Sequence, residues 1–133
     1  MNLLHKEITE KIIKSFYKVY NTLGYGFLEK VYENAMAIEL RKIGFEVNCQ
    51  YPITVFYESE IVGAYYADII VNDLVIIELK ASNALMEDHE CQLINYLKAT
   101  DIELGLLINF GKEAEYKRKV FMNKYKKLKA TNY

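Results

Sequence analysis

The stretch that decides the fold is DIIVNDLVIIELK, residues 68–80. Its two apolar runs flank the turn signal Asn72-Asp73, so the stretch predicts two adjacent antiparallel strands. The second run is unbroken, as expected for a central strand that is covered on both faces. That strand nevertheless ends in two charged residues, Glu78 and Lys80, which points to a site at the end of the sheet.

The spacing of the charged residues determines which of them can meet. Glu78 and Lys80 lie two residues apart on one strand, so both side chains project from the same face. Asp68 lies on the preceding strand, and the turn between the strands decides whether its carboxylate reaches that of Glu78. A two-residue turn would place Asp68 opposite Ile77, whereas a three-residue connection through Leu74 pairs it with Glu78. We therefore predict an odd-length turn or a bulge.

Two converging carboxylates would form a hard oxygen site. Asp68 and Glu78, with the carbonyl of Leu79, suit Mg²⁺ or Mn²⁺. Lys80 would then orient or deprotonate an attacking water, or neutralise a phosphate. Taken alone, the three charged residues are more typical of a cross-strand ion pair at the end of a sheet.

Residues outside this stretch add to the pattern. Gln92 and Tyr96 stand four apart on the following helix, so they can direct an amide and a phenol toward the same strand end. Glu29, in the first turn of an earlier helix, is a third carboxylate for a metal site. Each also has a structural interpretation: Glu29 complements the helix dipole, Gln92 is a surface residue and Tyr96 is a core residue.

Three further residues are candidates for substrate contacts. His89, near a helix start, fits either a role in the site or a helix cap. Lys98 and Arg118 fit either phosphate contacts or ordinary surface positions.

The spacing of apolar residues predicts the remaining helices and strands. Helices are predicted over about residues 6–22, from about residue 28 to just before Gly44, and over about residues 87–99. The buried stripe expected on the second helix consists of Leu28, Val31, Tyr32, Ala35 and Ile38. Strands are expected three times between residues 45 and 80, then over 103–110 and at an edge over 116–122. The resulting α/β (α+β) fold is one domain over residues 1–133, in which 123–133 is a frayed basic tail.

The amino-acid composition limits the classes of protein to which the chain can belong. A chain of 133 residues, 52% hydrophobic and 26% charged, is expected to fold as one soluble domain, alone or as a homo-oligomer such as a homodimer. Residues 1–11 contain no continuous apolar run, so we expect no signal peptide, no membrane span and a cytoplasmic location. Cys49 and Cys91 lack C-x-x-C spacing and are expected to be reduced and structural.

The small net charge of −1 conceals an asymmetry. Residues 1–111 carry 9 basic and 16 acidic side chains, whereas residues 112–133 carry 8 basic and 2 acidic ones. A basic segment can contact a phosphate backbone, but a lysine-rich terminus is more often simply solvated.

The chain resembles a known family in the combination of its motifs. GFLEKVY at residues 26–32 matches the pattern that gives the small GxxExxY proteins their name, a branch of the PD-(D/E)XK nuclease superfamily related to RecB-like nuclease domains. The resemblance continues through Asp68, VIIELKA at residues 75–81, HECQLINYLK at 89–98 and GLLINFG at 105–111, and it covers roughly residues 5–122. Two departures are Ala67, where the family name has proline, and Gly63, which lies further from Asp68 than a G-x-x-D pattern expects.

The resemblance implies an αβββαβ restriction-endonuclease-like core that cleaves nucleic acid, DNA being the expected substrate, with the strandedness left open. It implies that Asp68 and Glu78 bind Mg²⁺ or Mn²⁺, that Lys80 is the catalytic lysine and that Glu29 is the helix-borne acid. Gln92 and Tyr96 would be the Q-x-x-x-Y pair. The alternative is a non-catalytic module that keeps the fold and binds nucleic acid or a protein. The acidic body of the chain weakens electrostatic capture of DNA and so keeps this alternative open.

Overall fold

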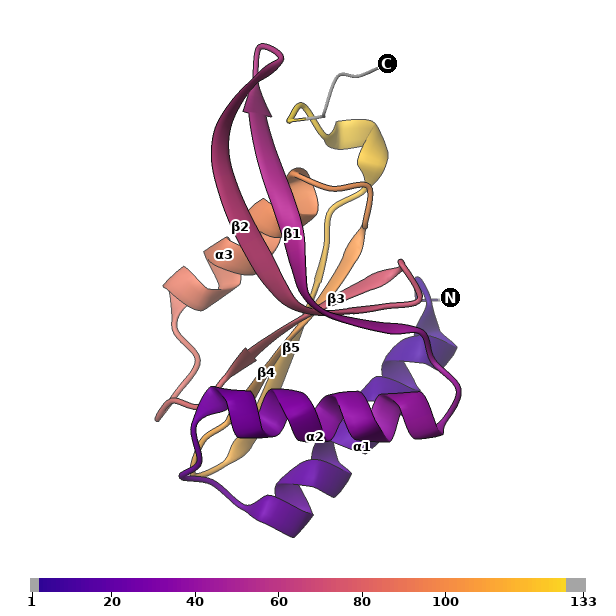
Figure 1. The fold of residues 1–133 in the computed structure, drawn as a ribbon, viewed down its shortest axis with the longest axis vertical. Helices are drawn as coiled ribbons and strands as arrows, with labels where there is room; N and C mark the ends of the chain where they lie inside the picture. Colours follow the sequence, from indigo (N-terminus) through magenta and orange to yellow (C-terminus); the bar gives the residue numbers. More distant parts are fainter. Residues whose placement is uncertain (1–2, 129–133) are drawn as a thin grey trace.

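A computed structural model of the chain describes residues 3–128 and contains one five-stranded sheet with helices on both faces (Figure 1). The strands are β1 (Val47–Tyr57), β2 (Glu60–Val71), β3 (Val75–Lys80), β4 (Leu104–Phe110) and β5 (Ala114–Val120). The helices are α1 (Lys6–Leu23), α2 (Glu29–Lys42), α3 (Glu87–Lys98) and a short 3-10 helix, η1 (Asn123–Tyr125). The predicted order of elements and the mixed α/β class are confirmed.

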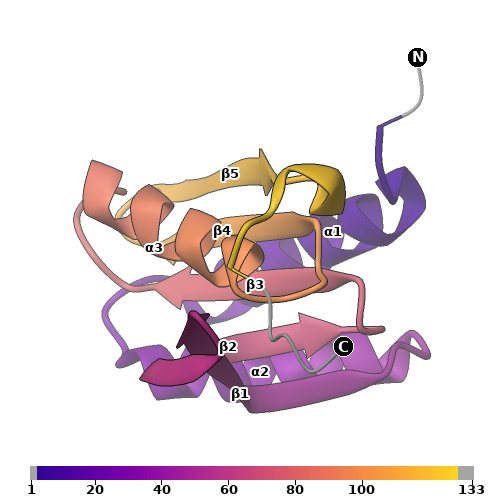
Figure 2. The same cartoon turned by 90° about the horizontal axis from the view of Figure 1, so that it is seen from above.

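The strands lie across the sheet in chain order, β1-β2-β3-β4-β5. The first three are antiparallel, β4 is parallel to β3, and β5 is antiparallel to β4. A parallel pair requires a crossover connection, which α3 provides. Figure 2 shows α3 on one face of the sheet and α1 and α2 on the other. Among the described residues, no helix is both long and apolar enough to cross a membrane.

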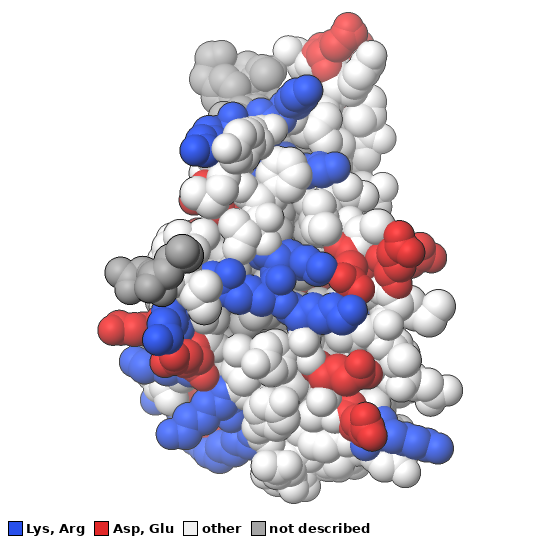
Figure 3. All heavy atoms as spheres, turned by 180° about the vertical axis from the view of Figure 1, so that it is seen from behind, with Lys and Arg blue, Asp and Glu red and all other residues white. Residues whose placement is uncertain are grey.

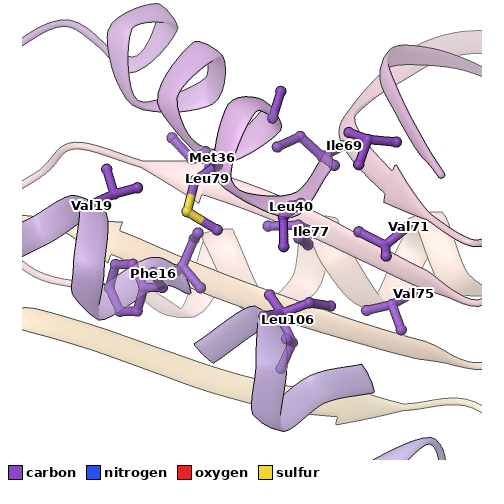
Figure 4. Packing of buried hydrophobic residues seen from close by; sticks show 14 of the residues in the cluster. Phe16, Val19, Met36, Leu40, Ile69, Val71, Val75, Ile77, Leu79 and Leu106 are labelled. Carbon is purple, nitrogen blue, oxygen red and sulfur yellow. The ribbon is translucent and has the colours of Figure 1, made fainter. Parts of the chain in front are cut away.

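Two apolar clusters hold these layers together. On one face, Phe16 of α1 and Met36 and Leu40 of α2 pack on Ile77 and Leu106 of the sheet (Figure 4). On the other face, α3 covers a smaller cluster that includes Leu93, Tyr96, Ile70, Ile76 and Leu107. Strand β3 is therefore buried from both sides, which explains its unbroken apolar run and confirms the prediction of a central strand.

The predicted stripe on α2 is wrong in its phase. The buried face is formed by Tyr32, Met36, Ala37 and Leu40, whereas Leu28 is 81% exposed and Ile38 is 57% exposed. The observed stripe is rotated by roughly one residue, about 100° around the helix, from the predicted one. Tyr32 sets this phase because its ring stacks on Phe110 of β4, with ring centroids 4.1 Å apart.

The expected frayed tail is also corrected over its described part. Residues 123–125 form η1, and the backbone of Asn123 donates to the carboxylate of Glu103 at 2.7 Å. Lys126 is 8% exposed, and its ammonium donates to the carbonyls of Thr100 and Ile102. These bonds fasten the segment to the loop between α3 and β4. Residues 129–133 lie outside the described part of the chain.

Candidate active site

The turn between β2 and β3 has the length that the site requires. Its three residues, 72–74, connect the paired residues Val71 and Val75, and the register continues to Ile69 opposite Ile77. Asn72 and Asp73 adopt left-handed backbone angles, with φ of 53° and 54°, which Asn and Asp tolerate better than most residues. The next positions along this register are Asp68 and Glu78. The predicted odd-length turn is therefore confirmed.

The regular pairing of β2 with β3 ends just before the carboxylates of Asp68 and Glu78. The backbone N–H of Asp68 donates to Oε1 of Glu78 at 3.0 Å, and the N–H of Leu79 donates to Oδ2 of Asp68 at 2.9 Å. Each side chain thus accepts a backbone donor from the opposite strand, in place of a backbone carbonyl. This exchange fixes the two carboxylates beside each other where the pairing of β2 with β3 ends.

A second pair of polar residues, absent from the prediction, supports Asp68 from the other side. Gln50 of β1 lies between the pairs Cys49–Ile69 and Tyr51–Ala67, and therefore faces Asp68 across the strands. Its amide nitrogen donates to Oδ1 of Asp68 at 3.3 Å and to Oε1 of Glu33 at 2.5 Å.

Glu33 and Gln50 differ in how far the sequence could have shown them. Glu33 lies on the buried face of α2 and is 4% exposed, with Lys30 at 2.7 Å as its ionic partner. A carboxylate beside Tyr32 and Met36 is the available signal, and the wrong helix phase concealed it. Gln50 has a φ of 51°, and nothing in its sequence context predicts this conformation.

The carboxylates of Asp68 and Glu78 are mostly buried and have no cationic side chain as an ion-pair partner among the described residues. Burial, and then the neighbouring charge of Asp68, raise the pKa of Glu78 to about 8. Burial also raises the pKa of Asp68, although the N–H of Leu79 opposes that shift. Within residues 3–128, neither carboxylate forms an ion pair with a lysine, arginine or histidine. Two adjacent hard oxygen donors without a cation are a suitable environment for a divalent metal ion.

Lys80 lies beside the carboxylates but bonds elsewhere. Its ammonium donates to Oε1 of Gln92 at 3.3 Å, and Nε2 of Gln92 donates to the hydroxyl of Tyr96 at 2.9 Å. The interpretation of Asp68, Glu78 and Lys80 as a simple ion pair is therefore wrong. The structure brings Lys80, Gln92 and Tyr96 together in one hydrogen-bonded chain from β3 to α3.

Glu29 remains at the margin of the group. It is exposed in the first turn of α2, and its charge raises the pKa of Glu78 less than burial and Asp68 do. Within the described residues, no three acidic, histidine or cysteine side chains are arranged to hold a metal ion together. The structure thus pairs Asp68 with Glu78 and leaves Glu29 outside the pair.

The three predicted substrate contacts have structural partners. Nδ1 of His89 accepts the N–H of Met86 at 3.1 Å and so caps α3. The ammonium of Lys98 lies over the ring of Phe121, 5.6 Å from its centroid. Arg118 donates to the carbonyl of Leu4 at 2.6 Å, which ties β5 to the start of α1. Neither Lys98 nor Arg118 joins the hydrogen-bonded group around Lys80.

The two cysteines are both free. Cys49 is partly buried against the larger core cluster, and burial raises the pKa of its thiol. Cys91 is exposed on α3, so the expected structural role describes Cys49 better than Cys91.

A mixed sheet flanked by helices, with paired carboxylates and a lysine where the pairing of its second and third strands ends, defines a restriction-endonuclease-like fold. The chain belongs to the PD-(D/E)XK nuclease superfamily, whose family model matches residues 6–120. Nucleases of this superfamily typically use divalent metal ions. The chemistry of the Asp68 and Glu78 donors fits such an ion.

A solved structure supports the fold independently. The crystal structure of SSO0001 is similar with a TM-score of 0.56 at 18% sequence identity, over 70% of this chain and 50% of that protein. The chain therefore spans about half the length of SSO0001, and at this identity the likeness concerns the fold alone. No curated protein sequence matches the chain significantly.

Proposed function

We propose that the chain is a Mg²⁺- or Mn²⁺-dependent nuclease that hydrolyses phosphodiester bonds, with DNA as its substrate, in the GxxExxY and RecB-like branch of the superfamily. One observation carries this proposal. Asp68 and Glu78 are held side by side without an ionic partner among the described residues, while Lys80 lies next to them and bonds to Gln92. In a purely structural charge cluster, Lys80 would form an ion pair with one of the carboxylates instead.

The oxygen donors would come from two strands. Asp68 and Glu78 would hold the metal, with the carbonyl of Leu79 as a further ligand and Glu29 as the acid available from α2. A bound divalent ion would stabilise charge on the phosphate and lower the pKa of a coordinated water. Binding requires both carboxyl groups in their ionised form, so Glu78 must release the proton that its raised pKa favours.

The remaining residues would position the substrate and the water. Lys80 would place its ammonium against the scissile phosphate or hold the attacking water. Gln92 accepts from Lys80 and donates to Tyr96, so it would restrain the lysine in one orientation. Gln50 restrains Asp68 in the same way from β1. These supporting contacts are what a precisely positioned catalytic group requires.

A cleavage assay with labelled single-stranded and duplex DNA tests the proposal. We expect cleavage that depends on Mg²⁺ or Mn²⁺ and stops on addition of EDTA. Asp68→Ala and Lys80→Ala should abolish cleavage while unfolding at a similar urea concentration to the wild type. Lys14→Ala, which alters an exposed lysine of α1, is the matched control and should cleave normally. Undiminished cleavage by either site variant would refute the assignment.

A second candidate is a binding module that keeps the fold without catalysis. The position of Glu29 favours it, because the described residues do not gather a third acid, histidine or cysteine around a metal. Calorimetric titration with Mn²⁺ separates the two candidates. A nuclease site should show metal affinity that Asp68→Ala removes, whereas a binding module should show none that depends on Asp68.

A further inference from the structure

A groove adjoins the candidate active site on the side of α3. It has a volume of about 710 Å³ and lies between the β1–β2 hairpin and α3, which run near each other in Figure 1. Val55, Gly63 and Tyr65 line it from the hairpin, and His89, Asn95 and Tyr96 are among the residues that line it from α3. Gln92 lines it too, so the groove is continuous with the hydrogen-bonded chain that begins at Lys80.

Tyr65 presents an aromatic surface inside this groove. Its side chain is 50% exposed, although its ring packs on Tyr96 with centroids 5.8 Å apart and planes inclined by 47°. Gly63 provides the space for the ring, because a Cβ at that position would lie 3.2 Å from Tyr65. The ring is therefore supported on one side and remains accessible to a ligand.

The charge of the groove indicates which part of a nucleic acid fits there. Within residues 3–128, no lysine or arginine lines it, and Asp88 adds a negative charge. Among these described lining residues a phosphate backbone would meet no cation, whereas a base needs none. A base needs an aromatic surface for stacking and a few polar groups for its edge.

Polar groups of this kind are present on α3. Asn95 is exposed and offers both an amide donor and a carbonyl acceptor. Nδ1 of His89 already accepts from the backbone of Met86, which leaves Nε2 as the ring nitrogen for a ligand. The lining is otherwise largely apolar, as is usual for a site that buries a flat ring.

We infer that this groove binds an unpaired nucleobase of a single-stranded nucleic acid, with Tyr65 as its stacking surface. The inference rests on the proposed function for its placement, because it sets the base beside the phosphate that Lys80 would contact. A base within a duplex is paired and stacked on its neighbours, so the groove favours single strands. Tyr65 thereby becomes a determinant of specificity for strandedness.

Fluorescence anisotropy of the full chain with a short labelled oligothymidine tests this inference, in buffer containing Ca²⁺. The variants are Tyr65→Ala and Tyr65→Phe, with Tyr57→Ala as the matched control because Tyr57 is also an exposed hairpin tyrosine but lies outside the groove lining. The loss of one base stack predicts that Tyr65→Ala binds about 5-fold to about 150-fold more weakly. Tyr65→Phe and Tyr57→Ala should each remain within about 2-fold of the wild type by the same reasoning.

An abasic oligonucleotide of the same length tests the base directly. It should bind the wild type as weakly as oligothymidine binds Tyr65→Ala, and the variant should not distinguish the two oligonucleotides. Duplex DNA should bind with no dependence on Tyr65.

The inference is overturned if wild-type protein does not bind the oligothymidine, if Tyr65→Ala and Tyr57→Ala bind alike, or if Tyr65→Ala weakens duplex binding equally. Binding that depends on Tyr65 without any cleavage would refute the proposed nuclease and leave the groove assignment standing. Cleavage together with oligothymidine binding that does not depend on Tyr65 would support the proposed nuclease and refute the groove assignment.

Discussion

Tyr32, the last residue of the GFLEKVY motif, has a structural role rather than a place among the candidate catalytic groups. Its side chain is fully buried, and its hydroxyl donates to the carbonyl of Gly24 at 2.8 Å and accepts the N–H of Phe27 at 3.2 Å. It thus holds the loop that leads into α2 and places Glu29 at the start of that helix.

We expect Tyr32→Phe to lower the free energy of unfolding by about 1–3 kcal/mol, because it removes two partly buried hydrogen bonds to the backbone, each worth about 0.5–1.5 kcal/mol. Urea unfolding measures this change. Tyr25→Phe, at a tyrosine that is 57% exposed in the same loop, is the control and should change stability by less than about 0.5 kcal/mol. Equal effects in the two variants would show that the hydroxyl of Tyr32 does not hold the loop.

Glu78 should make the stability of the metal-free protein depend on pH. Its pKa is about 8 in the fold, against an ordinary value of 4.5, so the folded state retains a proton that the unfolded chain releases. The free energy of unfolding should therefore fall as pH rises from about 4.5 to about 8, with a slope of at most about 1.4 kcal/mol per pH unit.

Urea unfolding in EDTA across this pH range tests the expectation. Glu78→Gln should flatten the slope, because the amide keeps an acceptor for the N–H of Asp68 but cannot ionise. An unchanged slope in this variant would assign the pH dependence to other groups, of which Asp68, with its own raised pKa, is the first to test.

At the scale of elements, the seating of α3 on β4 depends on a glycine. A Cβ at Gly105 would lie 2.6 Å from Cδ1 of Leu93, a fully buried residue on the face of α3 that packs against the sheet. Gly105→Ala should therefore push the helix outward and destabilise the protein by about 1–3 kcal/mol. This displacement would move Gln92 and Tyr96, which α3 carries next to Leu93.

A double-mutant cycle measured by urea unfolding checks this contact. Leu93→Ala alone should cost about 2–5 kcal/mol, but it also makes room for the added methyl group. The double variant should therefore be more stable than the sum of the two single effects predicts. Strict additivity would mean that Gly105 and Leu93 do not crowd each other.

How far the sequence predicted these elements varied with the physical signal. The strands and the odd-length turn were predictable because side chains alternate with a period of two and a one-residue change reverses the face. The phase of α2 was not, because apolar residues occur on more than one side of that helix and only the stack of Tyr32 on Phe110 selects the buried one.

The candidate site was predictable only in part, for similar reasons. Asp68, Glu78, Lys80, Gln92 and Tyr96 follow from regular strand and helix spacing, and the structure places them together. Gln50 itself has a left-handed φ inside strand β1, and this conformation lets its amide reach Asp68. The periodicity of the sequence does not encode such a conformation. Long-range partners of this kind depend on tertiary packing.

At the scale of the whole molecule, positive charge is distributed rather than concentrated. Figure 3 shows Lys and Arg in several groups on the face seen there, one of them near its middle, with Asp and Glu beside them. Lys117 and Lys119 both pair with Glu90, and Lys18 and Lys42 both pair with Glu39. The basic C-terminal segment is therefore partly neutralised by the body of the protein.

This distribution predicts a shallow dependence of nucleic-acid binding on salt. Few phosphates should be neutralised, so the slope of log K against log salt concentration should be no steeper than about −4. Anisotropy titrations of oligothymidine at several salt concentrations measure the slope. A slope of about −7 or steeper would indicate an extended basic surface and contradict binding through a base groove and a small site.

The most direct test of the central claim is a crystal structure of the protein soaked in Mn²⁺, with the metal located by its anomalous scattering. We predict a peak between the carboxylates of Asp68 and Glu78, with oxygen atoms from both at about 2.0–2.3 Å. Anomalous density elsewhere, or none at this pair under conditions in which Mn²⁺ supports cleavage, would contradict the assignment of Asp68 and Glu78 as the metal-binding core of the site.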